Sequence, residues 1–150
     1  MGTRSTISRE NSDGSVTGIY CHWDGYVSHN GRILHEHYDT DELTQALIGL
    51  GDLSSLAPEI GEPHPFDNPH PYGSPAHQEH HQRYRHWCMA YGRDRGETGV
   101  EAVTYPDLKS FMEARAQEFN YHRRQGQWYV SQDGARFVPL QTLLVESFTV

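Results

Sequence analysis

The clearest pattern along the chain is an alternation of apolar and polar residues in four short segments. In chain order these segments are Thr3–Glu10, Val16–Trp23, Phe119–Arg124 and Gln127–Ser131. Turn-forming residues separate each pair, at Asn11–Gly14 and at Gln125-Gly126. Alternation places successive side chains on opposite faces of a strand, and Asn and Gly favour tight turns. The pattern therefore predicts a β-hairpin near each end of the chain, with a further strand at Val100–Tyr105.

Helical spacing and capping residues mark the segments between the hairpins. Thr40 is a good N-cap for Asp41–Leu50, which carries Leu43, Leu47, Ile48 and Leu50 on one side and is ended by Gly51. Further helices are expected at Gly31–Tyr38, from Pro75 to Trp87 or Cys88, from Pro106 to about Glu118, and at Leu140–Ser147.

Five prolines fall within Ala57–Ser74, so this segment is predicted to be a long Pro-rich loop (57–74) without regular structure. Strands and helices mix without a βαβ rhythm, and no internal repeat is visible. The fold class expected is α+β. Residues 1–150 should form a single domain, with an antiparallel sheet from the two hairpins packed with three to four helices.

Composition narrows the function. Twenty acidic residues outnumber twelve basic ones, giving a net charge of −8, which argues against general nucleic-acid binding. No run is apolar enough to cross a membrane and no signal peptide is apparent, so a cytoplasmic location is expected. Cys21 and Cys88 are expected to be free thiols. Eleven histidines make the charge sensitive to pH near about 6.5. No cofactor is predicted.

The densest group of functional side chains is Ile19–Tyr26, at the end of the second predicted strand. In a strand, Tyr20, His22 and Asp24 would share one face. His22 and Asp24 are the candidate catalytic pair, because a carboxylate beside a histidine suits a general base. The candidate ligand-binding residues of this segment are Tyr20, His22, Trp23, Asp24 and Tyr26. Arg32 joins them, because it could clamp an anion. The alternative is structural: Tyr20 and Trp23 would be core aromatics, Asp24-Gly25 a simple turn, and His22 bonded to backbone.

Histidines gather in the second third of the chain, at His64, His70, His77, His80, His81 and His86. His77 and His81 are four residues apart on a predicted helix, so both could reach one metal ion. They are weak metal candidates, because the HExxH order is absent. The alternative is a set of solvated side chains.

Arg93-Asp94-Arg95, between Gly92 and Gly96, is a third candidate. Two guanidinium groups on a glycine-bounded loop suit a phosphate or a carboxylate, so Arg93 and Arg95 are candidate ligand-binding residues. An internal Arg–Asp–Arg salt bridge that fixes the loop is the equal alternative.

Several of these segments also resemble a family of small proteins encoded mainly by tailed bacteriophages and related mobile elements. The resemblance rests on TRSTI (Thr3–Ile7), IYCHWDGY (Ile19–Tyr26), Gly31–Tyr38, Tyr91–Glu97 and Gly126–Ser131. Shorter relatives often carry Pro where this chain has Val27. The resemblance implies a phage accessory protein that acts in the bacterial host cytoplasm, and it implies no catalytic residues.

Three functions are consistent with the sequence. The first is a non-enzymatic binding inhibitor of a host or antiviral-defence factor, either a protein or a small nucleotide. Aromatic and Arg residues, which dominate binding energetics, favour it. The second is a small phosphoester hydrolase that uses His22 and Asp24 with Arg residues. The third is a structural or virion-associated subunit, which a homo-oligomer would favour.

Overall fold

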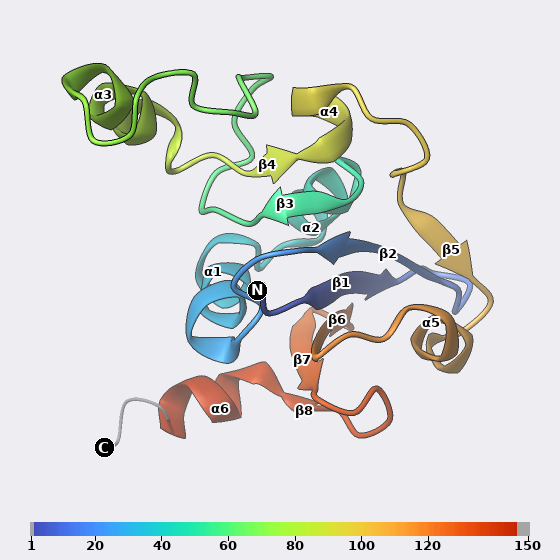
Figure 1. Cartoon of the computed structure of the whole chain (residues 1–150). Coiled ribbons are helices and arrows are strands. Elements are labelled where there is room, and N and C mark those ends of the chain that lie inside the picture. Colours follow the sequence, from blue (N-terminus) through green and yellow to red (C-terminus); the bar gives the residue numbers. More distant parts are fainter. Residues whose placement is uncertain (1, 147–150) are drawn as a thin grey trace.

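Both predicted hairpins are present and lie side by side at the centre of an eight-stranded sheet (Figure 1). The computed structural model describes residues 2–146. Strand β1 (Ser5–Glu10) pairs antiparallel with β2 (Val16–Cys21), and β6 (Phe119–Arg124) pairs antiparallel with β7 (Gln127–Ser131). β1 also pairs in parallel with β6, and this contact joins the two hairpins into one sheet.

Four short strands extend the sheet on both sides. They are β3 (Leu53–Ser55), β4 (Met89–Ala90), β5 (Val103–Tyr105) and β8 (Val138–Pro139). The strand order is β4-β3-β2-β1-β6-β7-β8, and β5 pairs with the first half of β2. The α+β class is confirmed. The sheet is mostly antiparallel rather than wholly so, because the β1–β6 and β2–β3 contacts are parallel.

Helices cover both faces of the sheet. Within residues 2–146 there are six α-helices, against the three to four expected, and one π-helical turn. They are η1 (Val27–Gly31), α1 (Arg32–His37), α2 (Asp41–Ile48), α3 (Pro75–Tyr84), α4 (Tyr91–Arg95), α5 (Leu108–Arg115) and α6 (Leu140–Glu146). The prediction for the last helix extended to Ser147, which lies outside the described residues.

The main core lies between the sheet and helices α1, α2 and α6. Ile7, Ile19 and Tyr121 point from the sheet into this layer and are fully or almost fully buried, as are Leu34 and Leu47 from the helices. Helix α5 covers the opposite face through Phe111 and Met112, which pack in a smaller cluster with Val16. The side chains of β2 alternate between the two layers, as the strand pattern predicts.

The starts of α2 and α3 are as predicted, whereas α5 begins at Leu108, capped by Asp107, instead of at Pro106. Several helices also end earlier than predicted. Thr40 accepts a hydrogen bond from Leu43 N at 3.1 Å, and Ser74 caps α3 in the same way. Helix α2 ends at Ile48, and Leu43 is exposed instead of facing the core. Helix α3 ends at Tyr84 instead of continuing to Trp87 or Cys88. It has no buried residue among those described, so little packing holds a longer helix in place.

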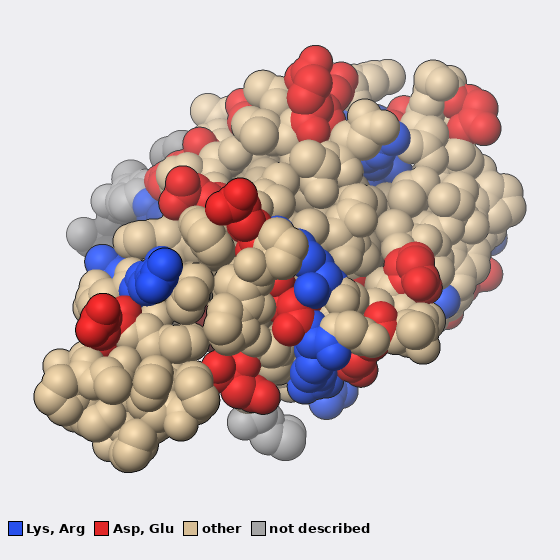
Figure 2. All heavy atoms as spheres, turned by 90° about the horizontal axis from the view of Figure 1, so that it is seen from above, with Lys and Arg blue, Asp and Glu red and all other residues tan. Residues whose placement is uncertain are grey.

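The Pro-rich loop 57–74 is irregular as predicted, apart from one bridge between Glu59 and Trp87. Tyr91–Glu97 was expected to be a loop, but its first five residues form helix α4, which ends at Gly96 with a φ of +73°. Seen from above, the end of the molecule that holds α3 forms a lobe whose tip shows no charged side chain (Figure 2). Residues 68–78 contain no Lys, Arg, Asp or Glu. No helix in the described part of the chain is long and apolar enough to cross a bilayer.

Candidate functional site

The segment His22–Tyr26 leaves the sheet and exposes two large aromatic side chains. Strand β2 ends at Cys21, so this segment is a loop rather than the end of a strand. The Trp23 side chain is 42% exposed and the Tyr26 side chain is 40% exposed. Trp23 is therefore not a core residue, and the structural alternative is wrong for it. We call His22–Tyr26 the aromatic loop.

Backbone hydrogen bonds hold the aromatic loop from both sides. His22 N donates to Leu53 O at 3.0 Å, and Trp23 N donates to Ser54 O at 3.0 Å. On the other side, Gly25 N donates to Thr3 O at 2.8 Å. Asp24 has a φ of 57°, in the left-handed region, which a short polar side chain tolerates. The loop conformation is thus fixed by the segments before β1 and within β3.

Two buried side chains support the same loop from beneath. Tyr121 Oη donates to Gly25 O at 2.6 Å, and Asn30 Nδ2 donates to Trp23 O at 3.2 Å. Both residues have no solvent exposure. Because a buried hydrogen bond is expensive to leave unmade, these contacts restrain the loop. The exposed aromatics therefore rest on a rigid base.

His22 pairs with Tyr20 and not with Asp24. Its Nδ1 lies 2.7 Å from Tyr20 Oη, and its ring meets the Trp23 ring edge-on at a centroid distance of 4.7 Å. Asp24 Oδ1 instead accepts from Tyr26 Oη at 3.4 Å. The predicted His22–Asp24 pair on one strand face is wrong, because the strand ends before His22 and Asp24 turns away. Among the described residues, no carboxylate orients the His22 ring.

The predicted basic residues are engaged elsewhere. Arg32 lies on α1 and forms an ion pair with Glu36 at 3.6 Å. Arg95 Nε binds Glu97 at 2.9 Å, and its guanidinium lies over the ring of Phe66. No contact in the described part of the chain joins Arg95 to the aromatic loop.

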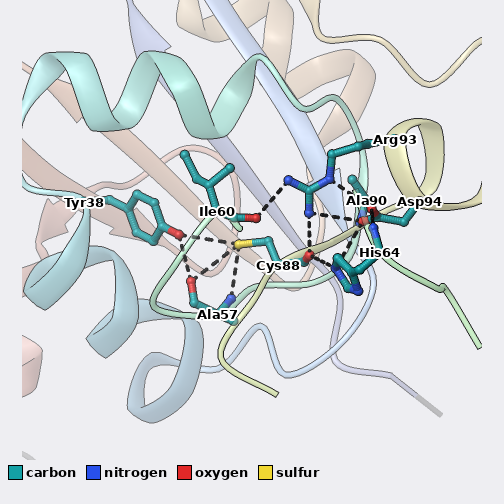
Figure 3. Close-up of polar contacts among 8 residues, drawn as sticks. All are labelled: Tyr38, Ala57, Ile60, His64, Cys88, Ala90, Arg93 and Asp94. Atoms are coloured by element: carbon teal, nitrogen blue, oxygen red, sulfur yellow. Dashed lines mark hydrogen bonds and ion pairs between the residues drawn. The ribbon is translucent and has the colours of Figure 1, made fainter. Parts of the chain in front are cut away.

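Arg93 belongs to a buried polar network around Asp94 (Figure 3). The Asp94 carboxylate has no solvent exposure. It accepts from Arg93 Nε at 2.9 Å, from Ala90 N at 2.8 Å and from His64 N at 3.1 Å. Arg93 and His64 both donate to Cys88 O at 2.9 Å. The internal salt-bridge alternative therefore describes Arg93, although His64 takes the place of Arg95.

The histidines of α3 do not assemble a metal centre. Within the described residues, no group of three or more His, Cys, Asp or Glu side chains could hold a metal ion. His77 contacts the ring of Tyr72 at 5.0 Å, and His81 is exposed. Cys21 and Cys88 are free and buried, and burial raises the pKa of the Cys21 thiol to about 12.

Sequence reasoning missed Asp52, which lines a cleft on the α5 face of the sheet. Its Oδ1 accepts from Tyr20 N at 3.0 Å, at the point where β2 exchanges β5 for β3 as its neighbour. Burial raises the pKa of the Asp52 carboxyl. The cleft has a volume of about 140 Å³ and also includes Phe111 and Arg115. Nothing in the sequence around Asp52 marks it, because its neighbours in the cleft come from distant segments.

Comparisons with protein-family models, curated proteins and solved structures gave no match to this chain. The function is therefore argued from the geometry of its own residues.

Proposed function

We propose that this chain is a non-enzymatic binding protein that captures a host or antiviral-defence protein through the aromatic loop. The proposal rests on one observation. Trp23 and Tyr26 are partly exposed on a backbone that hydrogen bonds from Tyr121 and Asn30 hold in place. An apolar side chain that stays about 40% exposed contributes less to the fold than a buried one, whereas a preordered side chain loses little entropy on binding. Trp and Tyr are also the residues that most often dominate an interface.

The resemblance to phage proteins supplies the setting of this proposal, which is the cytoplasm of a bacterial host. The pairing of His22 with Tyr20 supports binding over hydrolysis, since no carboxylate within residues 2–146 contacts the ring to activate it as a base. His22 can still donate a hydrogen bond to a partner or accept one from it. The aromatic loop thus combines two apolar anchors with one polar contact.

The test compares two exposed aromatic residues on different parts of the surface. Purified wild-type protein, the Trp23→Ser variant and the Tyr72→Ser variant are each incubated with bacterial lysate and examined by native mass spectrometry. Tyr72 is 94% exposed and lies on the α3 lobe, so it is a matched control. We expect one discrete added mass with the wild type and with Tyr72→Ser. The affinity of the captured partner for the Trp23→Ser variant should be lower by about tenfold or more.

Thermal midpoints separate a lost contact from a lost fold. The Trp23 side chain is half exposed, so Trp23→Ser should change the midpoint little. A bare chain in every sample, or a partner that binds Trp23→Ser as tightly as the wild type, would contradict the proposal. A homo-oligomer that fills the same surface would favour the structural-subunit alternative instead.

A further inference from the structure

The cleft beside Asp52 holds a carboxylate oxygen that the protein leaves without a hydrogen bond. Asp52 Oδ1 accepts from Tyr20 N, while no group among the described residues donates to Oδ2. The carboxylate is half-buried, and Arg115 does not come close enough for an ion pair. This oxygen stays accessible from solvent, so it can accept a hydrogen bond from a ligand that brings an N–H group.

The cleft has both apolar and polar walls, and its lining residues include hydrogen-bond donors. Val103 and the buried ring of Phe111 line the inside. Arg115 uses Nε to bind Tyr105 Oη at 3.1 Å, which leaves its two terminal nitrogens for other acceptors. The Gln117 side chain also lines the cleft, and its amide makes no hydrogen bond with the described residues. The site therefore offers one acceptor inside and several donors around it.

The volume of the cleft matches a single ring. Its volume is about 140 Å³, and a cavity of about 150 Å³ accepts benzene in another protein. A bicyclic purine would exceed this volume and extend out of the open side of the cleft. A six-membered heterocycle fits, provided that it carries an amine for Asp52 and a carbonyl for Arg115 or Gln117.

We propose that this cleft binds an amino-substituted six-membered heterocycle, of which the cytosine base is the biological example. The exocyclic amine of cytosine donates to Asp52 Oδ2, which is the contact that carboxylates make with this base elsewhere. The ring carbonyl accepts from Arg115 and Gln117. Uracil carries a carbonyl where cytosine carries the amine, so it presents an acceptor to the carboxylate. This site adjoins the aromatic loop through Tyr20, which lines the cleft and contacts His22, and it goes beyond the function proposed for that loop.

The experiment titrates purified protein with cytidine and with uridine, using calorimetry. Cytidine should bind saturably and about tenfold or more tightly than uridine. Asp52→Asn keeps the acceptor for Tyr20 N but presents an amide donor to the cleft. The Asp52→Asn variant should lose the preference for cytidine and should bind uridine more tightly than the wild type does. Glu101→Gln removes a neighbouring carboxylate that does not line the cleft, and it should bind cytidine within about twofold of the wild type.

Thermal midpoints of both variants should stay near that of the wild type, because the hydrogen bond to Tyr20 N is retained. Three results would overturn the proposal. They are the absence of saturable cytidine binding, equal affinity for the two nucleosides, and an Asp52→Asn variant that still prefers cytidine. Tighter binding of guanosine than of cytidine would overturn the argument from size. None of these results depends on a partner for the aromatic loop.

Discussion

At the scale of single residues, His122 is the clearest case of a titratable group held in an unfavourable environment. Its Nδ1 lies 2.8 Å from Ser8 Oγ, and its Nε2 is buried without a hydrogen-bond partner among the described residues. Ser8 Oγ also lies 3.3 Å from Tyr121 O, so its hydroxyl can donate to either group and the tautomer of His122 decides which partner donates in the Ser8–His122 hydrogen bond. Within the described residues, Nε2 lacks a partner in both tautomers. Burial lowers the pKa of His122 to about 4, because a charged ring in this position has lost its water.

This lowered pKa predicts a loss of stability in mild acid. The unfolded chain takes up the His122 proton near pH 6.5, before the folded protein does at about pH 4. Stability is therefore complete above pH 6.5 and falls as the pH drops between these two values, by about 3 kcal/mol in all. In urea unfolding at about pH 7 and about pH 5, the wild type should lose about 2 kcal/mol more than His122→Leu. Equal losses in the two proteins would show that His122 does not titrate on unfolding.

At the scale of elements, helix α5 approaches the sheet closely because β2 contains Gly18. A Cβ atom at this position would lie 2.5 Å from Cζ of Phe111, closer than real side chains come. Phe111 is almost completely buried and cannot easily turn away. The position of α5, and with it the wall of the Asp52 cleft, depends on the missing side chain of one glycine.

Gly18→Ala should therefore cost about 1–3 kcal/mol of the free energy of unfolding, through overpacking against Phe111. Combining it with Phe111→Leu should recover part of the loss relative to the sum of the two single changes. Gly92→Ala is the matched control, because its new Cβ makes only ordinary contact at 3.4 Å with Val100 and its site is helical. That change should be neutral or slightly stabilising. If Gly18→Ala unfolds at the same denaturant concentration as the wild type, the close approach of α5 is wrong.

Local signals explain what the sequence could predict about the elements. Hairpin turns and helix caps involve residues within a few positions of one another, as in Thr40 with Leu43 or Gln125 with Gly126. Strands β3 and β4 are only three and two residues long. They exist because a neighbouring strand offers hydrogen bonds, and no local pattern marks them. The same is true of the end of β2, which depends on its contacts with the short strand β3.

The candidate site could likewise be predicted where its features are local in the sequence, but not where they depend on distant segments. The aromatic loop was recognisable, because its unusual residues are consecutive. The pairing of Tyr20 with His22 was not, since it depends on where the strand ends. The role of Asp52 could not be predicted, because Tyr20, Arg115 and Asp52 come together only after folding.

At the scale of the whole molecule, the Asp94 network joins segments that no regular pairing connects. Arg93 Nη1 donates to Ile60 O at 2.9 Å in the Pro-rich loop, and His64 from the same loop reaches Cys88 O before β4. Asp94 itself comes from α4. The network thus anchors residues 60–64 against the edge of the sheet. On the other side of Cys88, Tyr38 Oη from the end of α1 donates to Ala57 O at 2.8 Å, which extends the link to the main core (Figure 3).

Asp94→Ala and Arg95→Ala should separate the two interpretations of the Arg93-Asp94-Arg95 motif. Removing Asp94 leaves Arg93 and a buried backbone N–H without their partner, at a cost of about 3–5 kcal/mol. Removing Arg95 breaks an exposed pair with Glu97 and should cost less than about 1 kcal/mol. Chemical denaturation of the two variants beside the wild type is the measurement. Similar small losses for both would mean that Asp94 is not the centre of a structural network.

The parallel pairing of β1 with β6 has a consequence for how the protein is made. Its partners lie 114 residues apart, as in Thr6 with Asn120. On the ribosome, the N-terminal hairpin is complete long before its central neighbour has been synthesised. One edge of β1 stays bare during that time, open to any other extended chain. Closing so long a loop also slows the final step of folding. The nascent chain is therefore most exposed to aggregation and to chaperones until the last fifth of the sequence emerges.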